Sequence, residues 1–137
     1  MIPFEVYATS PAPPAALWAL VGDLRRLTEW TDAETIAGAP EPPLEVGQRF
    51  ATSDRGRERG WVIITTAERL VEIKTDDTPC GRLGIGVRAA PDPLGSRLVL
   101  AGLLDAPPRG LRARTMHVPR LRARFDRWCS AAVSLAR

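Results

Sequence analysis

The middle of the chain, from residue 48 to residue 104, carries one recurring pattern that limits the possible folds more than any other feature. Short segments rich in valine, isoleucine, leucine and threonine alternate with turn residues such as Asp54-Arg55-Gly56. Segments of this kind are typical of β-strands with one buried face. Because the turns leave no room for crossover helices, the strands form an antiparallel meander. We expect these strands at 48–54, 61–67, 70–75, 81–89 and 97–104.

The first third of the chain predicts one more strand followed by two short helices. Residues 3–9 alternate at period two, as a half-buried strand does. Prolines fit only the first turn of a helix, so the proline-rich stretch that follows predicts a helix over about 13–21. A second short helix is expected over 23–28, ending near Trp30, and a short strand around 35–37.

The end of the chain predicts one long amphipathic helix. Because proline lacks a backbone N–H, this helix either begins at Pro119 or is joined there, with a kink, by an earlier segment at 109–118. Apolar side chains share one stripe at helical spacing: Leu121, Phe125, Trp128, Cys129, Ala132 and Ala136.

Length and composition predict one domain over 1–137 with a core of its own. No apolar run is long enough to cross a membrane, and the first residues do not resemble a signal peptide, so we expect a cytoplasmic protein. In that compartment Cys80 and Cys129 are free thiols rather than a bridge. The net charge of +3 is weak evidence for an anionic partner, because Lys74 is the one lysine among nineteen basic residues, a bias that a GC-rich genome produces.

Five stretches of the sequence resemble, in order, motifs of the polyketide cyclase/dehydrase branch of the START-like (SRPBCC) superfamily. This resemblance implies an α+β helix-grip fold, in which a bent antiparallel sheet of about six to seven strands wraps round a long C-terminal helix. It also implies two short helices after the first strand and a hydrophobic cavity between sheet and helix. It does not imply one activity, since the superfamily includes cyclases, lipid carriers and hormone receptors. The stretches are Ala12–Leu24, Glu29-Trp30, Leu44–Phe50, Gly60-Trp61-Val62 and Gly95-Ser96-Arg97-Leu98.

On that topology a set of apolar residues would line the interior and carry ligand binding. The alternative is that these side chains fill the core and leave no cavity, whereas a cavity of several hundred Å3 would favour binding. The candidate ligand-binding residues are Trp30, Phe50, Ile73, Ile85, Val87, Leu100, Leu121 and Phe125, with Phe4, Val6 and Leu98 as further lining residues.

Polar candidates are few, and we assign no catalytic residue, metal site or cofactor. His117 is the single histidine, and no second ligand stands at metal-binding spacing from it. Arg114 would face the cavity if the helix ran straight through Pro119, and both residues join the candidate ligand-binding set. Each also has a plain interpretation as an exposed or hydrogen-bonded side chain. Arg88 is a further guess, while the adjacent Asp76-Asp77 fits a turn.

Three functions remain open at this point. The leading hypothesis is a domain that binds a hydrophobic or aromatic small molecule, with no nucleic acid as partner and with a homodimer as one possible state. The alternative is a polyketide cyclase or dehydratase that shapes its substrate and excludes water. The third is contact of an arginine-rich helix with nucleic acid or an acidic protein, through Arg109, Arg112, Arg114, Arg120, Arg122, Arg124 and Arg127.

Overall fold

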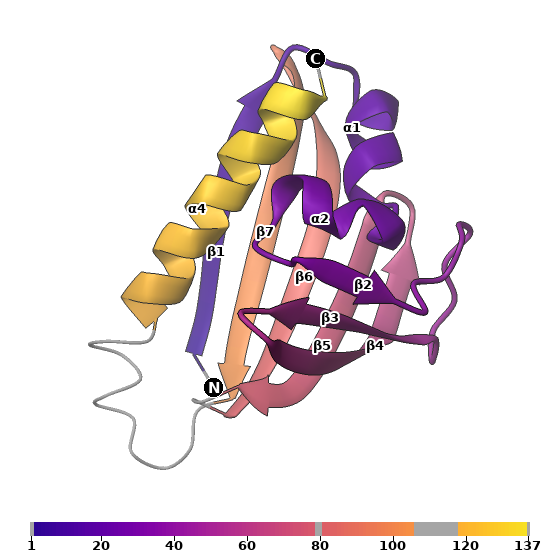
Figure 1. Cartoon of the computed structure of the whole chain (residues 1–137). Helices are drawn as coiled ribbons and strands as arrows, with labels where there is room; N and C mark the ends of the chain where they lie inside the picture. The colour runs from indigo at the N-terminus through magenta and orange to yellow at the C-terminus, as the bar shows by residue number, and fades with distance from the viewer. Residues whose placement is uncertain (1, 79–80, 106–117, 137) are drawn as a thin grey trace.

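A single antiparallel sheet of seven strands forms the frame of the protein, in the order β1-β7-β6-β5-β4-β3-β2 (Figure 1). The computed structural model describes residues 2–78, 81–105 and 118–136. Consecutive strands from β2 to β7 are neighbours, and β1 joins the far edge beside β7. The strands are β1 (Ile2–Ser10), β2 (Thr35–Ala37), β3 (Arg49–Asp54), β4 (Arg57–Ala67), β5 (Leu70–Thr78), β6 (Gly81–Asp92) and β7 (Gly95–Asp105).

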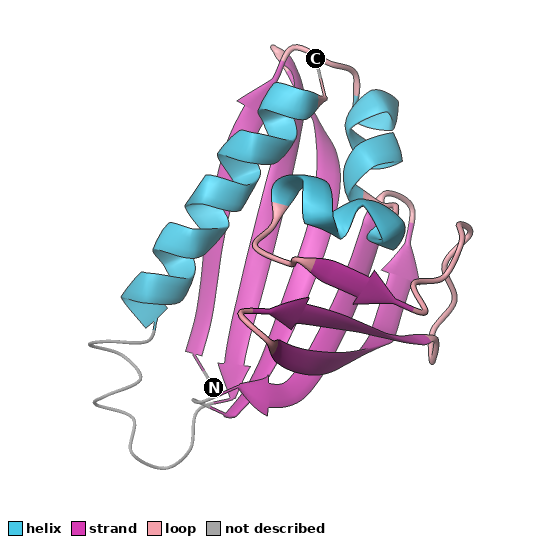
Figure 2. Ribbon diagram, viewed as in Figure 1, coloured by secondary structure: helices cyan, strands magenta, loops and turns pink. Residues whose placement is uncertain are grey.

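The described helices lie on one face of this sheet, as Figure 2 shows. The long helix α4 packs mainly on β1, and α1 packs on β6 and β7. The short pair η1 and α2 crosses the sheet near β2 and contacts α4. Their bounds are α1 (Pro14–Val21), η1 (Leu24–Arg26), α2 (Leu27–Trp30) and α4 (Val118–Leu135).

An aromatic cluster joins α4 to the sheet. Phe125 has no exposed surface, and its ring centroid lies 5.1 Å from that of Phe4 on β1 and 5.0 Å from that of Trp128. Burial of large aromatic side chains is a dominant contribution to core stability. The cluster therefore anchors the long helix across the first strand of the chain.

The fold class predicted from the sequence is confirmed: an α+β helix-grip arrangement with a C-terminal helix and two short helices after the first strand. Two details of the strands were wrong. The fourth strand begins at Arg57, because Arg55 and Gly56 both have positive φ (53° and 73°) and close a tight turn that lets Asp54 pair with Arg57. Asp76-Asp77 lies within β5, not in a turn, since β5 runs on through a register irregularity to Thr78.

The helix α4 begins at Val118, one residue before Pro119. Proline is tolerated in the first turn of a helix, and Pro119 is the second residue of α4 as described. The segment 109–117, on which the predicted kink depended, lies outside the described residues. None of the helices in the described part of the chain has both the length and the apolar content needed to cross a membrane.

Candidate functional site

A small pocket lies between the inner face of the sheet, the η1–α2 segment and α4. Its volume is about 70 Å3, and the exposed and half-buried lining residues at 31–33, 52 and 54 mark its mouth. Most of its exposed wall is apolar. The pocket is lined by Leu24, Leu27, Trp30, Thr31, Asp32, Ala33, Thr52, Asp54, Arg59, Trp61, Ile73, Ile85, Val87, Leu100, Arg124 and Trp128.

The floor of the pocket comes from the alternation of three adjacent strands. Ile73 is paired with Ile85 across β5 and β6, and Val87 is paired with Leu100 across β6 and β7. Because paired residues in an antiparallel sheet point to the same face, all four side chains lie on the inner face and are buried. They form an apolar surface of branched side chains on the inner face.

The η1–α2 segment covers this floor. Leu24, Leu27 and Trp30 are all buried and form this wall of the pocket. The segment has only seven helical residues, so side-chain contacts, not backbone ladders to the sheet, hold it in place. We refer to residues 23–33 as the cover.

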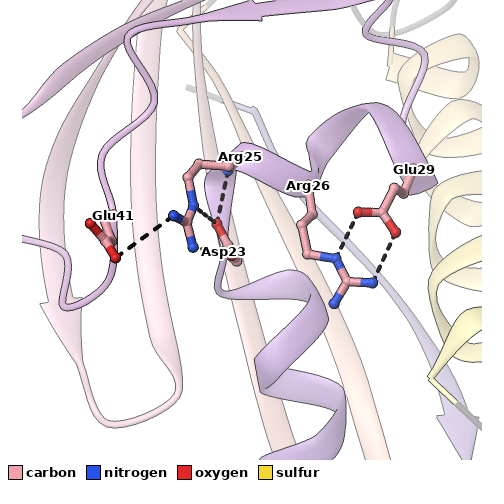
Figure 3. Close-up of polar contacts among 5 residues, drawn as sticks. All are labelled: Asp23, Arg25, Arg26, Glu29 and Glu41. Carbon is pink, nitrogen blue, oxygen red and sulfur yellow. Dashed lines mark hydrogen bonds and ion pairs between the residues drawn. The ribbon is translucent and has the colours of Figure 1, made fainter.

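Charged side chains fix the outer side of the cover (Figure 3). Asp23 accepts a hydrogen bond from the backbone N–H of Arg25 at 3.1 Å, and the Arg25 guanidinium donates to the same carboxylate from Nε and Nη2 at 2.9 Å each. Arg25 also reaches Glu41 at 3.9 Å. Hydrogen bonding from Arg25 lowers the pKa of Asp23 below its usual value. Further along, Arg26 donates to both carboxylate oxygens of Glu29 at 2.6 and 2.8 Å.

The mouth of the pocket is bridged by one ion pair. Arg124 Nε on α4 lies 3.3 Å from Asp32 Oδ2 in the cover. Both side chains are partly exposed, at 31% and 42%. This pair is a contact between the long helix and the cover at the point where a ligand would enter.

Three tryptophans line the pocket, and they differ in their hydrogen bonding. Trp61 Nε1 donates to Thr52 Oγ1 at 2.9 Å. The Nε1 atoms of Trp30 and Trp128 are shielded from solvent, and neither has a hydrogen-bond partner within the part of the chain that the structure describes. Buried polar groups are usually paired, so two such donors beside one pocket require an explanation.

The structure brings together five of the candidate residues from the sequence, Trp30, Ile73, Ile85, Val87 and Leu100, as pocket lining. The other apolar candidates pack elsewhere. Phe50 is buried and stacked on Trp61 at 6.4 Å, Leu121 is half-buried against the core, and Phe125 lies in the aromatic cluster described above. Arg114 and His117 lie outside the described residues.

One further expectation needs correction. Arg88 is exposed on β6, on the opposite face from its buried neighbour Val87, and does not line the pocket. The pocket, at about 70 Å3, also does not reach the several hundred Å3 that would favour ligand binding over a filled core. Phe4 and Phe125 fill the space between β1 and α4.

Several lining residues were missed by sequence reasoning. Leu24 and Leu27 show helical spacing but no sign that their segment would cover a pocket. Trp61 and Thr52 lie on adjacent strands. They could have been found from Phe50, because Trp61 is its partner across the strands and Thr52 follows two residues later, so all three lie on the same face. Arg124 was counted with the arginine-rich face of the helix. The charge of Arg124 is paired with that of Asp32 at the pocket, whereas Arg120, Arg122 and Arg127 are exposed.

Cys129 is a free thiol with 1% exposure on the buried side of α4. Burial raises the pKa of this thiol to about 12, with a smaller effect from the negative charge of Asp126. Such a thiol is a poor nucleophile. The described residues contain no group of three or more His, Cys, Asp or Glu side chains that could hold a metal ion.

Comparison with known proteins agrees with this architecture. A family model described as polyketide cyclase / dehydrase and lipid transport matches residues 1–132. The chain belongs to this family. No curated protein matches the sequence.

Solved structures share the fold at low sequence identity. A protein from Nitrosospira multiformis has a TM-score of 0.78 at 12% identity, over 99% of this chain and 97% of that one. A protein from Thermobifida fusca has a TM-score of 0.72 at 20% identity, over 99% and 93%. The Zhui aromatase/cyclase from a Streptomyces species has a TM-score of 0.72 at 17% identity, over 98% and 93%. At these sequence identities the likeness shows that this chain shares their fold and does not show what it binds. Its ligand therefore has to be argued from its own pocket.

Proposed function

We propose that this protein binds an aromatic or otherwise hydrophobic small molecule in the pocket beneath the cover. The observation that carries the proposal is a pocket with an apolar floor of Ile73, Ile85, Val87 and Leu100 and with exposed lining residues at its mouth. Ligand pockets are mostly apolar and contain a few polar groups that orient the ligand. The membership in a family that includes lipid transport and cyclase proteins supports the same conclusion.

The ligand requires movement of the cover. A buried apolar cavity of about 150 Å3 accommodates benzene, and this pocket has a volume of about 70 Å3. The sheet is held by continuous backbone ladders and α4 by the aromatic cluster, whereas the cover is held by side chains alone. The described arrangement is thus the closed state, and the cover is the wall that yields.

A thermal-shift measurement against a panel of aromatic polyketides, fatty acids and sterols tests the proposal. A ligand at a concentration of 100 times its Kd stabilises the folded state by about 2.7 kcal/mol, which raises the Tm by roughly 8 °C. Ala33→Phe places a ring in the mouth of the pocket and should abolish this shift. Ala37→Phe is the matched control, because Ala37 is exposed on β2 outside the pocket. A flat response across the panel contradicts the proposal.

A polyketide cyclase or dehydratase is the second candidate, favoured by the charged side chains that meet at the mouth. Asp32, Asp54, Arg59 and Arg124 all line that rim, where a carboxylate could accept a proton and a guanidinium could stabilise an enolate. The similarity of fold to the Zhui aromatase/cyclase points the same way. Conversion of a bound polyketide to a cyclised product, detected by mass spectrometry and lost in Asp54→Asn, would favour the enzyme over the binding domain.

A further inference from the structure

The two unpaired indole N–H groups specify a chemical property of the ligand, an inference that rests on the proposed function. Trp30 lines the pocket from α2 and Trp128 lines it from α4, so the two indoles belong to different walls. The third lining indole, Trp61, has its hydrogen bond to Thr52. Among the described residues, the missing partners are therefore specific to Trp30 in the cover and Trp128 on α4.

An indole nitrogen donates a hydrogen bond and cannot accept one. Leaving such a donor buried without an acceptor carries a free-energy penalty, whereas pairing it removes that penalty. A ligand that offers only C–H or N–H groups would leave both donors as they are. A ligand with an oxygen acceptor would pair them.

The two rings are held in different ways. The Trp128 ring stacks on Phe125 with an interplanar angle of 21°, whereas Trp30 is 3% exposed at the end of α2 and moves with the cover. Aromatic side chains lose little conformational entropy on binding, which favours their use as hydrogen-bond donors. Because both Nε1 atoms are shielded in the closed state, an incoming group reaches them only as the cover moves.

We infer that the ligand is an aromatic molecule with a carbonyl or phenolic oxygen, and that Trp30 and Trp128 donate hydrogen bonds to that oxygen. The apolar floor binds the ring and the two indoles select the acceptor. This assigns both tryptophans as specificity-determining residues. An aromatic hydrocarbon of the same shape lacks the group that they recognise.

The test compares α-tetralone with tetralin, two bicyclic molecules that differ in one carbonyl group. The isotope-labelled protein has four tryptophans, and its indole N–H resonances are followed by two-dimensional NMR during each titration. We expect α-tetralone to bind about tenfold more tightly than tetralin and to move the Trp30 and Trp128 proton resonances downfield. The resonance of Trp18, which lies over Gly22 outside this pocket, should stay in place.

Variants provide the second measurement. Trp30→Phe and Trp128→Phe keep an aromatic ring but remove the donor, and each should reduce the preference for the ketone several-fold. Trp18→Phe is the matched control and should leave the preference unchanged. Equal affinities for ketone and hydrocarbon, or a bound panel ligand that leaves the two resonances unmoved, would overturn the inference while the proposed function stands. If neither probe nor any panel member binds, both fail.

Discussion

The ring of Phe4 lies over Gly102, the residue directly opposite it in the β1–β7 pairing. A Cβ atom added to Gly102 would overlap the atoms of that ring. Phe125 packs against the same ring, with the two ring centroids 5.1 Å apart, which restricts its movement. Glycine is therefore required here for space, and it lets the sheet accept the aromatic cluster.

Replacement of Gly102 by alanine should destabilise the protein. Overpacking of a filled core costs about 1–3 kcal/mol, so the free energy of unfolding in urea should fall by that amount in Gly102→Ala. The double variant Phe4→Leu/Gly102→Ala should lose less than the sum of the two single changes, because leucine leaves space for the new methyl group.

Gly84 provides the matched control on β6. A Cβ atom added there would lie 3.7 Å from the nearest atom, Leu103 Cβ, which is ordinary van der Waals contact. Gly84→Ala should leave stability unchanged or raise it by about 0.5–1 kcal/mol, since glycine loses more backbone entropy on folding. An equal loss of stability in Gly84→Ala and Gly102→Ala would show that the Phe4 ring is not the reason why glycine is required at position 102.

Removal of the ion pair at the mouth should loosen the cover without unfolding the protein. Exposed ion pairs contribute about 0.2–1 kcal/mol, so Arg124→Gln should change global stability by less than about 1 kcal/mol. Amide hydrogen exchange across residues 27–33 should become faster, and ligand association should become faster with it. Arg120→Gln, at an exposed position of the same helix, is the control. Identical exchange in the two variants would contradict a role for Arg124 in closure.

Acid should open the cover through Asp23. The folded protein lowers the pKa of this carboxyl, so its stabilising contribution is complete above the usual value of 3.8 and is lost as the pH falls through the lowered pKa. The protection factors of the amides at residues 24–30, which correct for the slower intrinsic exchange in acid, should therefore fall below about pH 4. Asp23→Ala should show faster exchange at neutral pH, roughly fivefold for the loss of about 1 kcal/mol, with less further change in acid. An unchanged acid response in this variant would rule out Asp23 as the titrating group.

Alkali should destabilise the protein through Cys129. The raised pKa means that the folded state holds the thiol proton more tightly than the unfolded chain does. Its contribution is complete below the usual value of 9.0 and is lost as the pH rises toward about 12. Urea unfolding of Cys129→Ala should lack this loss. In a Cys80→Ser variant, Cys129 should react with a thiol reagent at pH 8 only after the protein unfolds. Rapid reaction of the folded protein would contradict the burial of Cys129.

The family resemblance and sequence alternation together predicted the floor of the pocket. Ile73, Ile85, Val87 and Leu100 were assigned to the interior on the topology that the resemblance implies, and the alternation of residues 70–75 and 81–89 agrees with the antiparallel pairing that brings them together. The same alternation placed Arg88 on the face with Gly84 and Gly86, so its position away from the pocket was already implied by the pattern.

The cover and the volume could not be predicted in this way. Leu24 and Leu27 are part of a three-residue and a four-residue helix, where helical spacing is too short to define a face. The contact between Arg124 and Asp32 joins segments 92 residues apart, which local pattern does not register. Pocket volume depends on how lining side chains such as Trp128 pack against their neighbours, and the periodicity of the sequence does not report this packing.

The cluster of Phe4 and Phe125 also has a consequence for biosynthesis. The ribosome makes Phe4 about 120 residues before its packing partner Phe125 on α4. At translation rates of about 5–20 residues per second, Phe4 waits several seconds before Phe125 can cover it. During that interval the nascent sheet presents an uncovered apolar face, which is a binding target for chaperones until α4 leaves the exit tunnel.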